Sequence, residues 1–252
     1  MLNFYTQLYM RNIYLALFFA CGLFMTLMSA AQSQTSQSFN EWGRECSSSE
    51  HQINTDNFYS SLGYRERSKK RCEITNQADL VLDKPFSLSF SFSTSSVNKT
   101  DSQWHSIFQI HSFPDKKMGE DWRCPVMALE VLNGQLRMFN RWDKSQLSIT
   151  DSGHCSNSGN TISSRLFFAD YDIEPDKIYE FELKGILSIS DSAWLTVNIN
   201  GEQIASLKGP NTFNDNKGPF IKLGIYKPTS WRLGDRFNYS YSDYIFEAIS
   251  WD

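Results

Sequence analysis

Hydrophobic and polar residues alternate along several short stretches of the chain. The clearest is residues 86–93, Phe-Ser-Leu-Ser-Phe-Ser-Phe-Ser, and a period of two is typical of a half-buried β-strand. Residues 178–184 alternate too, with Tyr179, Phe181 and Leu183 predicted to point inward and charged residues outward. No stretch has convincing helical periodicity. The pattern therefore predicts an all-β chain.

Two Asn-Gly dipeptides divide this pattern, Asn133-Gly134 and Asn200-Gly201. Such pairs favour the tight two-residue turns of β-hairpins. Strand-like segments flank them at residues 126–132, 135–142, 194–200 and 203–207, and residues 244–249 would add a closing strand. Many strands, two hairpins and long polar loops predict two packed antiparallel sheets, a β-sandwich or jelly roll.

The N-terminal segment differs from the rest of the chain. Residues 1–31 combine Arg11, an apolar run and the small residues Ser29-Ala30-Ala31, which predict an export signal that is cleaved. Residues 32–38 are predicted to be a polar linker and residues 39–252 a single domain. We expect a secreted protein, extracellular or periplasmic, that has no membrane attachment after the signal is removed.

The mature chain keeps four cysteines: Cys46, Cys72, Cys124 and Cys155. An even number in an exported protein implies two disulfides. Four cysteines allow three pairings, and sequence order favours Cys46–Cys72 with Cys124–Cys155. No Cys-x-x-Cys and no paired histidine spacing is present, so the sequence predicts no metal centre.

Composition and charge limit the classes of partner that the protein can bind. The chain has 252 residues, of which 40% are hydrophobic and 15% aromatic, enough for one large β-domain after the signal. Its 24 basic residues less Arg11 leave 23 against 28 acidic residues, a formal charge of −5. Such a protein repels polyanions as a whole, so we expect no nucleic-acid partner. An anionic ligand would need a local basic site.

Three strand-like segments place pairs of long polar side chains on one face. The pairs are Gln109 with His111, Lys222 with Tyr226, and Arg71 with Glu73. Strict alternation also puts His105 on the face of His111, as a candidate binding residue. We add two further candidate substrate-binding cations, Arg67 from the basic stretch 65–71 and Arg137 from the strand-like segment 135–142.

These segments resemble the three signature strands of jelly-roll polysaccharide lyases, the alginate-lyase-like and heparin-lyase-like enzymes. The matching residues are Arg71-Cys72-Glu73, Gln109-Ile110-His111 and Lys222-Leu223-Gly224-Ile225-Tyr226. The resemblance covers roughly residues 40–252. The chain departs from the family pattern at Cys72, where Ser is frequent, at Phe220, where alginate lyases have Tyr, and in having no basic residue after Glu73.

The resemblance implies a secreted enzyme that cleaves a uronate-containing anionic polysaccharide by β-elimination. Arg71 and Gln109 would neutralise the substrate carboxylate, because the C5 proton beside it is otherwise very weakly acidic. His111 would act as base and Tyr226 as acid, or Tyr226 would serve in both roles. Lys222, Glu73, His105, Arg67 and Arg137 would contribute to substrate binding. We expect a monomer that requires no cofactor, and a structural calcium would be compatible with the family.

Other readings stay open at this stage. A carbohydrate-binding, lectin-like protein could retain the same face without the chemistry. A glycoside hydrolase needs two carboxylates across the bond, and the strand carriers Glu180 and Glu182 lack an aromatic frame. Each single residue also has a structural explanation, such as a surface ion pair between Arg71 and Glu73.

Overall fold

The computed structural model describes residues 35–36, 38–46, 51–63, 71–76, 80–97, 99, 104–151, 153, 155, 159–227 and 236–249. The predicted export signal and the candidate Arg67 lie outside these residues. Residues Gln34–Asp252 form one compact unit. Within the described part of the chain, no helix has the length and apolar character needed to cross a bilayer.

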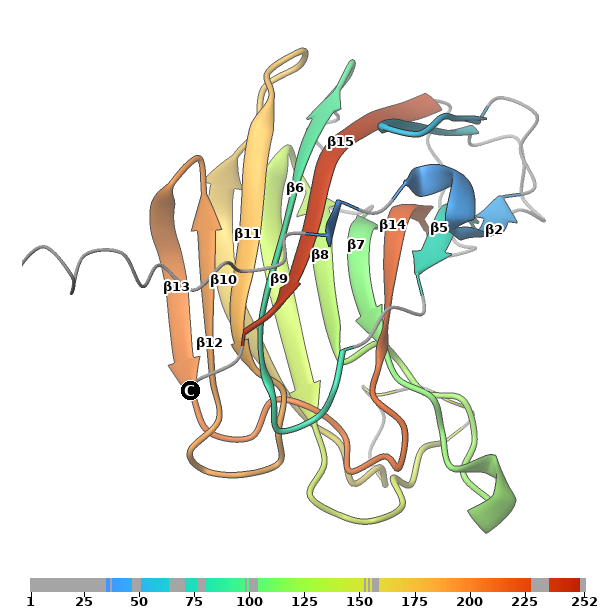
Figure 1. The fold of residues 1–252 in the computed structure, drawn as a ribbon, viewed down its shortest axis with the longest axis vertical. Helices are drawn as coiled ribbons and strands as arrows, with labels where there is room; N and C mark the ends of the chain where they lie inside the picture. The colour runs from blue at the N-terminus through green and yellow to red at the C-terminus, as the bar shows by residue number, and fades with distance from the viewer. Residues whose placement is uncertain are drawn as a thin grey trace, which may run out of the picture. The chain divides into compact units, whose positions relative to one another are not determined.

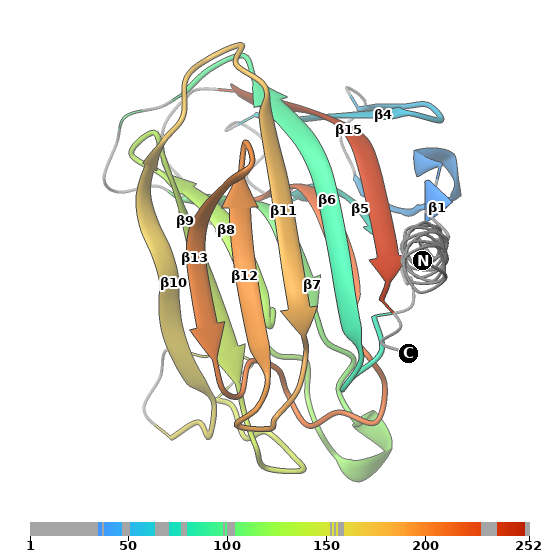
Figure 2. The ribbon, with the colours of Figure 1, turned by 60° about the vertical axis from the view of Figure 1, so that its left-hand side comes forward.

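The described strands form two antiparallel sheets that lie one over the other (Figures 1 and 2). The first sheet has the order β13-β12-β11-β6-β15-β4-β3, with β1 also paired to β15. Its strands are β1 (Thr35–Ser36), β3 (Gln52–Ile53), β4 (Asn57–Gly63), β6 (Pro85–Thr94), β11 (Tyr179–Ile186), β12 (Trp194–Ile199), β13 (Glu202–Lys208) and β15 (Arg236–Ala248). This arrangement confirms the predicted all-β sandwich.

The second sheet has the order β10-β9-β8-β7-β14-β5-β2 and is the sheet that positions the polar segments. Its strands are β2 (Gly43–Cys46), β5 (Arg71–Asn76), β7 (His105–His111), β8 (Met127–Leu132), β9 (Gln135–Trp142), β10 (Ser163–Asp172) and β14 (Phe220–Tyr226). Two short 3₁₀ helices, η1 (Phe39–Glu41) and η2 (Lys116–Met118), lie in the connections between strands.

The core fills the space between the two sheets. Phe90 of β6 packs against Phe181 of the neighbouring β11 and against Phe108 of β7 in the opposite sheet, with ring centroids 5.1 and 5.2 Å apart respectively. All three rings are essentially inaccessible to solvent. The alternation of residues 86–93 therefore has the predicted cause, because every second side chain of β6 enters this core.

Both predicted hairpins are present. Asn133 and Gly134 have φ of 53° and 77°, and Asn200 and Gly201 have φ of 52° and 77°. Two consecutive left-handed residues define the turn that best matches strand twist, which explains why Asn-Gly stands at each position.

Several elements were not predicted from the pattern. The expected linker contributes β1, whose residues pair with Ile245 and Phe246 of β15. The segment before residue 64 has no clear alternation of hydrophobic and polar residues, yet it contains β2, β3 and β4. β10 was missed because its register against β9 shifts on both sides of Phe168, and these irregularities interrupt the alternation.

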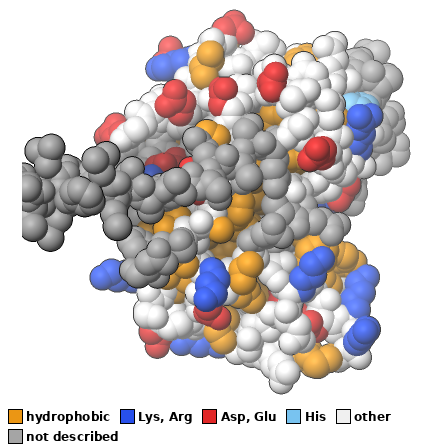
Figure 3. Space-filling view, in the orientation of Figure 1, with side chains coloured by type: hydrophobic (Ala, Val, Ile, Leu, Met, Phe, Trp, Pro, Cys, Tyr) orange, Lys and Arg blue, Asp and Glu red, His pale blue; other side chains and the backbone are white. Residues whose placement is uncertain are grey.

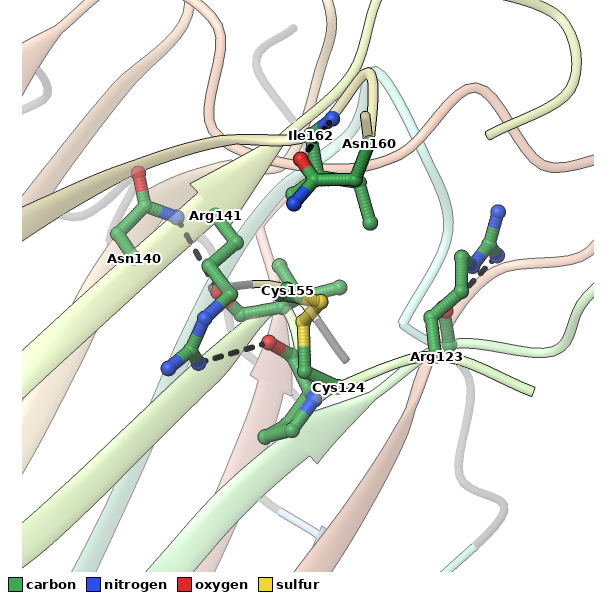
Figure 4. Close-up of a disulfide and its surroundings, with 10 residues drawn as sticks. Arg123, Cys124, Asn140, Arg141, Cys155, Asn160 and Ile162 are labelled. Carbon is green, nitrogen blue, oxygen red and sulfur yellow. Dashed lines mark hydrogen bonds between the residues drawn. A yellow bond between two sulfur atoms is a disulfide. The ribbon is translucent and has the colours of Figure 1, made fainter. Parts of the chain in front are cut away.

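The two disulfides are those that sequence order favours, Cys46–Cys72 and Cys124–Cys155. Cys46 and Cys72 are register partners, so their bond ties the edge strand β2 to β5. Cys124 precedes β8, and its bond fastens the loop that contains Cys155 next to the start of that strand (Figure 4).

Candidate active site

Strand register brings the three polar segments together on the face of the second sheet that points away from the core. β14 lies between β7 and β5. Lys222 is the register partner of Gln109 on one side, and Tyr226 is the partner of Arg71 on the other. Phe220, one alternation before Lys222, is the partner of His111. Residues far apart in the sequence thus share one surface, which we call the β5–β14–β7 face.

Glu45 of β2 joins the two cations of this face. Its Oε2 accepts hydrogen bonds from Arg71 Nη1 and from Lys222 Nζ, both at 2.7 Å. Partial burial alone would raise the pKa of Glu45, but the bonds and charges of Lys222 and Arg71 outweigh it and lower that pKa. The ion pairs hold Arg71 and Lys222 side by side. Glu45 lies in the region without a clear pattern, so sequence reasoning missed it.

Glu73 lies beneath this pair and is only 1% exposed. Its Oε1 accepts a 2.6 Å hydrogen bond from Gln109 Nε2, and its Oε2 is 3.5 Å from Arg71 Nη1. Burial raises the pKa of Glu73 to about 7, although the charges of Lys222 and Arg71 oppose this shift. Glu73 is therefore placed to hold the Gln109 amide, and its part in substrate binding stays a prediction.

A close backbone approach explains the glycine at the centre of the face. Gly224 is the register partner of Glu73 and has φ of 122°, a conformation that other residues rarely adopt. A Cβ atom at this position would lie 2.2 Å from the Cys72 carbonyl oxygen and 2.7 Å from Glu73 Cα. Gly224 lets β5 and β14 approach closely enough for their polar side chains to meet.

His111 is half-buried at one end of the face. Its ring stacks on Phe220 at 5.5 Å and meets the edge of the exposed Trp122 at 5.7 Å. Nδ1 lies 3.2 Å from the backbone oxygen of Ser112. Burial lowers the pKa of His111 to about 4, with Lys222 and Arg71 contributing in the same direction. The imidazole is therefore neutral near pH 7.

Tyr226 lies at the other end of the face. Its half-buried ring is 5.2 Å from the Arg71 guanidinium carbon and 6.3 Å from the ring of Trp104. The central cations and amide thus lie between a neutral imidazole and a phenol. This set offers one acid–base group at each end of the face and, between them, hydrogen-bond donors suited to a carboxylate.

A buried ionic network lies behind His111. Arg123 donates to Asp215 Oδ1 at 2.6 Å and to Ser112 Oγ at 3.0 Å, and it also pairs with Glu120. Glu120 accepts from the backbone N–H of Ser148 at 2.7 Å. Because Ser112 follows His111 and accepts from its ring, this network fixes the turn that orients the imidazole. None of its members was predicted, since they come from loops without a pattern.

His105 does not belong to this face, so its predicted role is wrong. A register shift between Ser106 and Phe108 inserts an extra residue in β7 and turns His105 toward the core. Its Nε2 is 2.7 Å from the Tyr239 hydroxyl, and its ring packs against Phe237 at 4.5 Å. Burial lowers the pKa of His105 to about 3. The histidine is a core residue.

Arg137 lies on the same side of the second sheet, but two strands away from β7. It belongs to β9 and donates from Nε and Nη2 to Glu130 Oε2 at 3.0 and 2.8 Å. On the same strand, the Trp142 ring centroid lies 4.2 Å from the Arg165 guanidinium carbon. Trp122 is 47% exposed beside His111, where its ring could stack on a sugar.

Three acidic residues near His111 are the candidates for holding a structural calcium. Asp115, Glu120 and Asp215 have carboxylate oxygens within 4.8 Å of one another. Arg123 already bonds to two of these residues and supplies positive charge there. A structural calcium stays a prediction that no contact among the described residues tests.

A comparison with protein families decides the affiliation. The profile of the family described as "Polysaccharide lyase" matches residues 26–245. The chain belongs to this polysaccharide lyase family. No curated protein gives a significant match. The affiliation agrees with the resemblance that the three polar segments indicated.

Solved structures share the fold of this polysaccharide lyase. An endo-β-1,4-glucuronan lyase from the fungus Trichoderma reesei is 13% identical, with a TM-score of 0.66 over 86% of this chain and 96% of that one. An alginate lyase of polysaccharide lyase family 7 is 14% identical, with a TM-score of 0.51 over 76% and 80%. A structure of botulinum neurotoxin type C is 13% identical, with a TM-score of 0.52 over 84% and 44%. At these identities the likeness establishes the fold only.

Proposed function

We propose that this polysaccharide lyase is a secreted enzyme that cleaves a uronate-containing polysaccharide by β-elimination at the β5–β14–β7 face. The main support is the convergence of Arg71, Lys222 and Gln109 between His111 and Tyr226. The glucuronan and alginate lyases among the structural neighbours favour an acidic polysaccharide as substrate.

Carboxylate binding would begin at the centre of this face. Arg71 and Lys222 share Glu45, and each keeps N–H donors beyond those that this carboxylate occupies. Gln109 uses one amide N–H for Glu73 and retains a second for the substrate. These fixed donors would stabilise the charge that develops on the uronate carboxylate when the C5 proton leaves.

His111 is our candidate for the base. A hydrogen bond from Nδ1–H to the Ser112 carbonyl would leave the Nε2 lone pair available, and the lowered pKa keeps the ring neutral at pH 7. His111 Nε2 would take the C5 proton, and the released electron pair would form the C4=C5 double bond.

Tyr226 is our candidate for the acid. Because it lies at the other end of the face from His111 and beside the Arg71 guanidinium, it is also the alternative candidate for the base. As the C4–O bond breaks, the Tyr226 hydroxyl would give its proton to the leaving oxygen. The phenolate would then recover a proton from water, and His111 would return the C5 proton to water, so that both residues regain their starting states. The products would be a chain with a new hydroxyl end and a chain that starts with an unsaturated uronate. Water is not consumed in the elimination, which distinguishes it from hydrolysis.

One observation favours a second candidate, a carbohydrate-binding protein without chemistry. The fold is shared with a botulinum neurotoxin structure whose description concerns interaction with two ganglioside molecules. A lectin of this kind would use the same donors to hold a sugar acid and would release no product.

The mature protein should be incubated with glucuronan, alginate, heparin and hyaluronan while absorbance of unsaturated uronate is followed. We expect new absorbance with at least one polymer, and its loss in Tyr226→Phe. The matched control is Tyr59→Phe, because Tyr59 lies on β4 of the other sheet. New reducing ends without new absorbance of unsaturated uronate would contradict β-elimination. Retention of the protein on a polymer without cleavage would support the lectin.

A further inference from the structure

A second cationic surface lies on the same side of the second sheet as the candidate active site. It consists of Arg137, Phe139 and Arg141 of β9, and we call it the β9 platform. Leu136 and Met138, which alternate with these residues, are fully buried in the core. The three platform side chains therefore point to the face that Gln109 and Lys222 share.

Strand register aligns the platform with the active site. Gln109 is the partner of Ala128 on β8, and Ala128 is the partner of Phe139. Only a methyl group thus stands between the Gln109 amide and the Phe139 ring along this row. Two strand spacings separate them, roughly 10 Å. That span suits a polysaccharide that crosses the strands and contacts both places with different sugar units.

The aromatic ring holds both guanidinium groups. The guanidinium carbons of Arg137 and Arg141 lie 5.0 and 5.4 Å from the centroid of Phe139. Such contacts restrict long side chains that would otherwise lose rotamer freedom when a ligand binds. The platform is therefore prepared for an anion before any ligand arrives.

The two arginines differ in their charge balance. Arg137 is neutralised by Glu130 through a hydrogen bond from each of two nitrogens. Arg141 donates from Nη1 to the Pro125 carbonyl at 3.2 Å, beside the Cys124–Cys155 disulfide (Figure 4). Among the described residues, no carboxylate lies within ion-pair distance of Arg141. With one acid against two arginines, the platform has a net positive charge.

We propose that the β9 platform is a subsite that binds the carboxylate of a second uronate unit, with Arg141 as its principal charge. The proposal rests on the proposed function, because it assumes a chain of repeating acidic sugars on this face. Such a subsite would make the enzyme prefer polymers in which neighbouring sugar units carry carboxylates. A neutral sugar at this position would leave the half-buried cation without a counter-charge.

The direct test measures kcat/KM on uronate oligomers of increasing length and on the polymer. We expect Arg141→Gln to reduce kcat/KM about tenfold on the polymer, as for the loss of one charge-assisted hydrogen bond. The reduction should grow with oligomer length, and KM should depend less steeply on salt than in the wild type. Arg141→Lys should recover part of the loss because it keeps the charge.

Two further variants complete the design. Phe139→Leu removes the ring that holds both guanidinium groups and should lower kcat/KM on the polymer in the same direction. Lys208→Gln removes an exposed charge on β13 of the other sheet and is the matched control. Thermal unfolding of each variant shows whether a loss of activity reflects a loss of fold.

The outcomes separate the subsite from the proposed function. A wild type that cleaves the polymer while Arg141→Gln keeps kcat/KM within twofold at every length would overturn the subsite alone. A wild type that binds uronate polymers without cleaving them would overturn the lyase, and the Kd of Arg141→Gln would then test the subsite. Absence of both binding and cleavage would overturn both proposals.

Discussion

The outer faces of the two sheets carry similar residue types, but they differ in how deeply their charged side chains are buried. On the first sheet, Glu182 and Lys184 of β11 form an ion pair, and their side chains are 30% and 41% accessible to solvent. On the second sheet, Glu73 and Lys222 are 1% and 4% exposed and belong to one cluster, in which Arg71 and Glu45 connect them. Desolvated charges that depend on one another are costly to bury, so they mark the second face as the one shaped for a ligand.

The face of the molecule shown in Figure 3 carries charges of both signs. In the view of Figure 3, basic and acidic side chains are interspersed over the exposed surface and form no field of a single sign. With a net charge of −4 for the whole chain, attraction of a polyanion must come from local groups. The β5–β14–β7 face and the β9 platform provide such groups.

The largest expected effect on stability comes from the network behind His111. Arg123→Met would leave the buried carboxylates of Glu120 and Asp215 without their cation, at a cost of about 3–5 kcal/mol in unfolding free energy. Lys144→Met is the control, since the Lys144–Asp191 pair is exposed and should contribute below about 1 kcal/mol. Denaturant unfolding measures both, and equal losses would contradict the distinction between buried and exposed ion pairs.

Glu73 should make stability depend on pH. Its folded pKa of about 7 lies above the ordinary value of 4.5, so the folded protein binds the proton more tightly. Stability from this group is therefore present below pH 4.5 and lost as pH rises through 7, by up to about 3 kcal/mol. Glu73→Gln should flatten the profile over this range, and Glu182→Gln should not. A profile unchanged by Glu73→Gln would contradict the assignment.

The same substitution should affect catalysis less strongly than loss of a reacting group. Glu73→Gln keeps an acceptor for Gln109 but removes the charge that orders its amide, and we expect about a tenfold fall in kcat/KM. Comparison of kcat and KM on the same polymer checks this. An unchanged kcat/KM would show that Gln109 needs no support from β5.

The smallest effect on catalysis is expected at His105. His105→Gln should leave kcat/KM within about twofold while costing roughly 1–3 kcal/mol of stability, because the side chain bonds Tyr239 inside the core. Thermal unfolding and polymer cleavage measured on the same sample separate the two quantities. A loss of activity with full stability would contradict the assignment of His105 as a core residue.

The two histidines of β7 show where sequence reasoning succeeded and where it failed. Alternation placed Gln109 and His111 correctly on one face, because β7 is regular from Phe108 onward. It misplaced His105, because a bulge cannot be read from a period of two. Both histidines have lowered pKa values, so a perturbed pKa alone does not separate a core residue from a candidate base.

Strong local signals predicted most of the sandwich, including both Asn-Gly turns, β6, β11 and the two disulfides. The missing parts depend on long-range partners. Glu45 and Arg123 have no local pattern, and only the folded chain brings them to Lys222 and to Ser112. The sequence therefore predicted that the polar residues of β5, β7 and β14 share one face, and it missed the residues that support them. The catalytic roles of these residues stay predictions.

The most direct test of the account is a measurement of unsaturated uronate produced from glucuronan by the wild type, His111→Asn and Glu182→Gln under identical conditions. We predict that His111→Asn lowers kcat by at least about a hundredfold, as for loss of a general base. Glu182→Gln, on the exposed face of the first sheet, should retain wild-type kcat. Full activity in His111→Asn, with wild-type stability, would contradict the central claim that His111 takes the C5 proton at the β5–β14–β7 face.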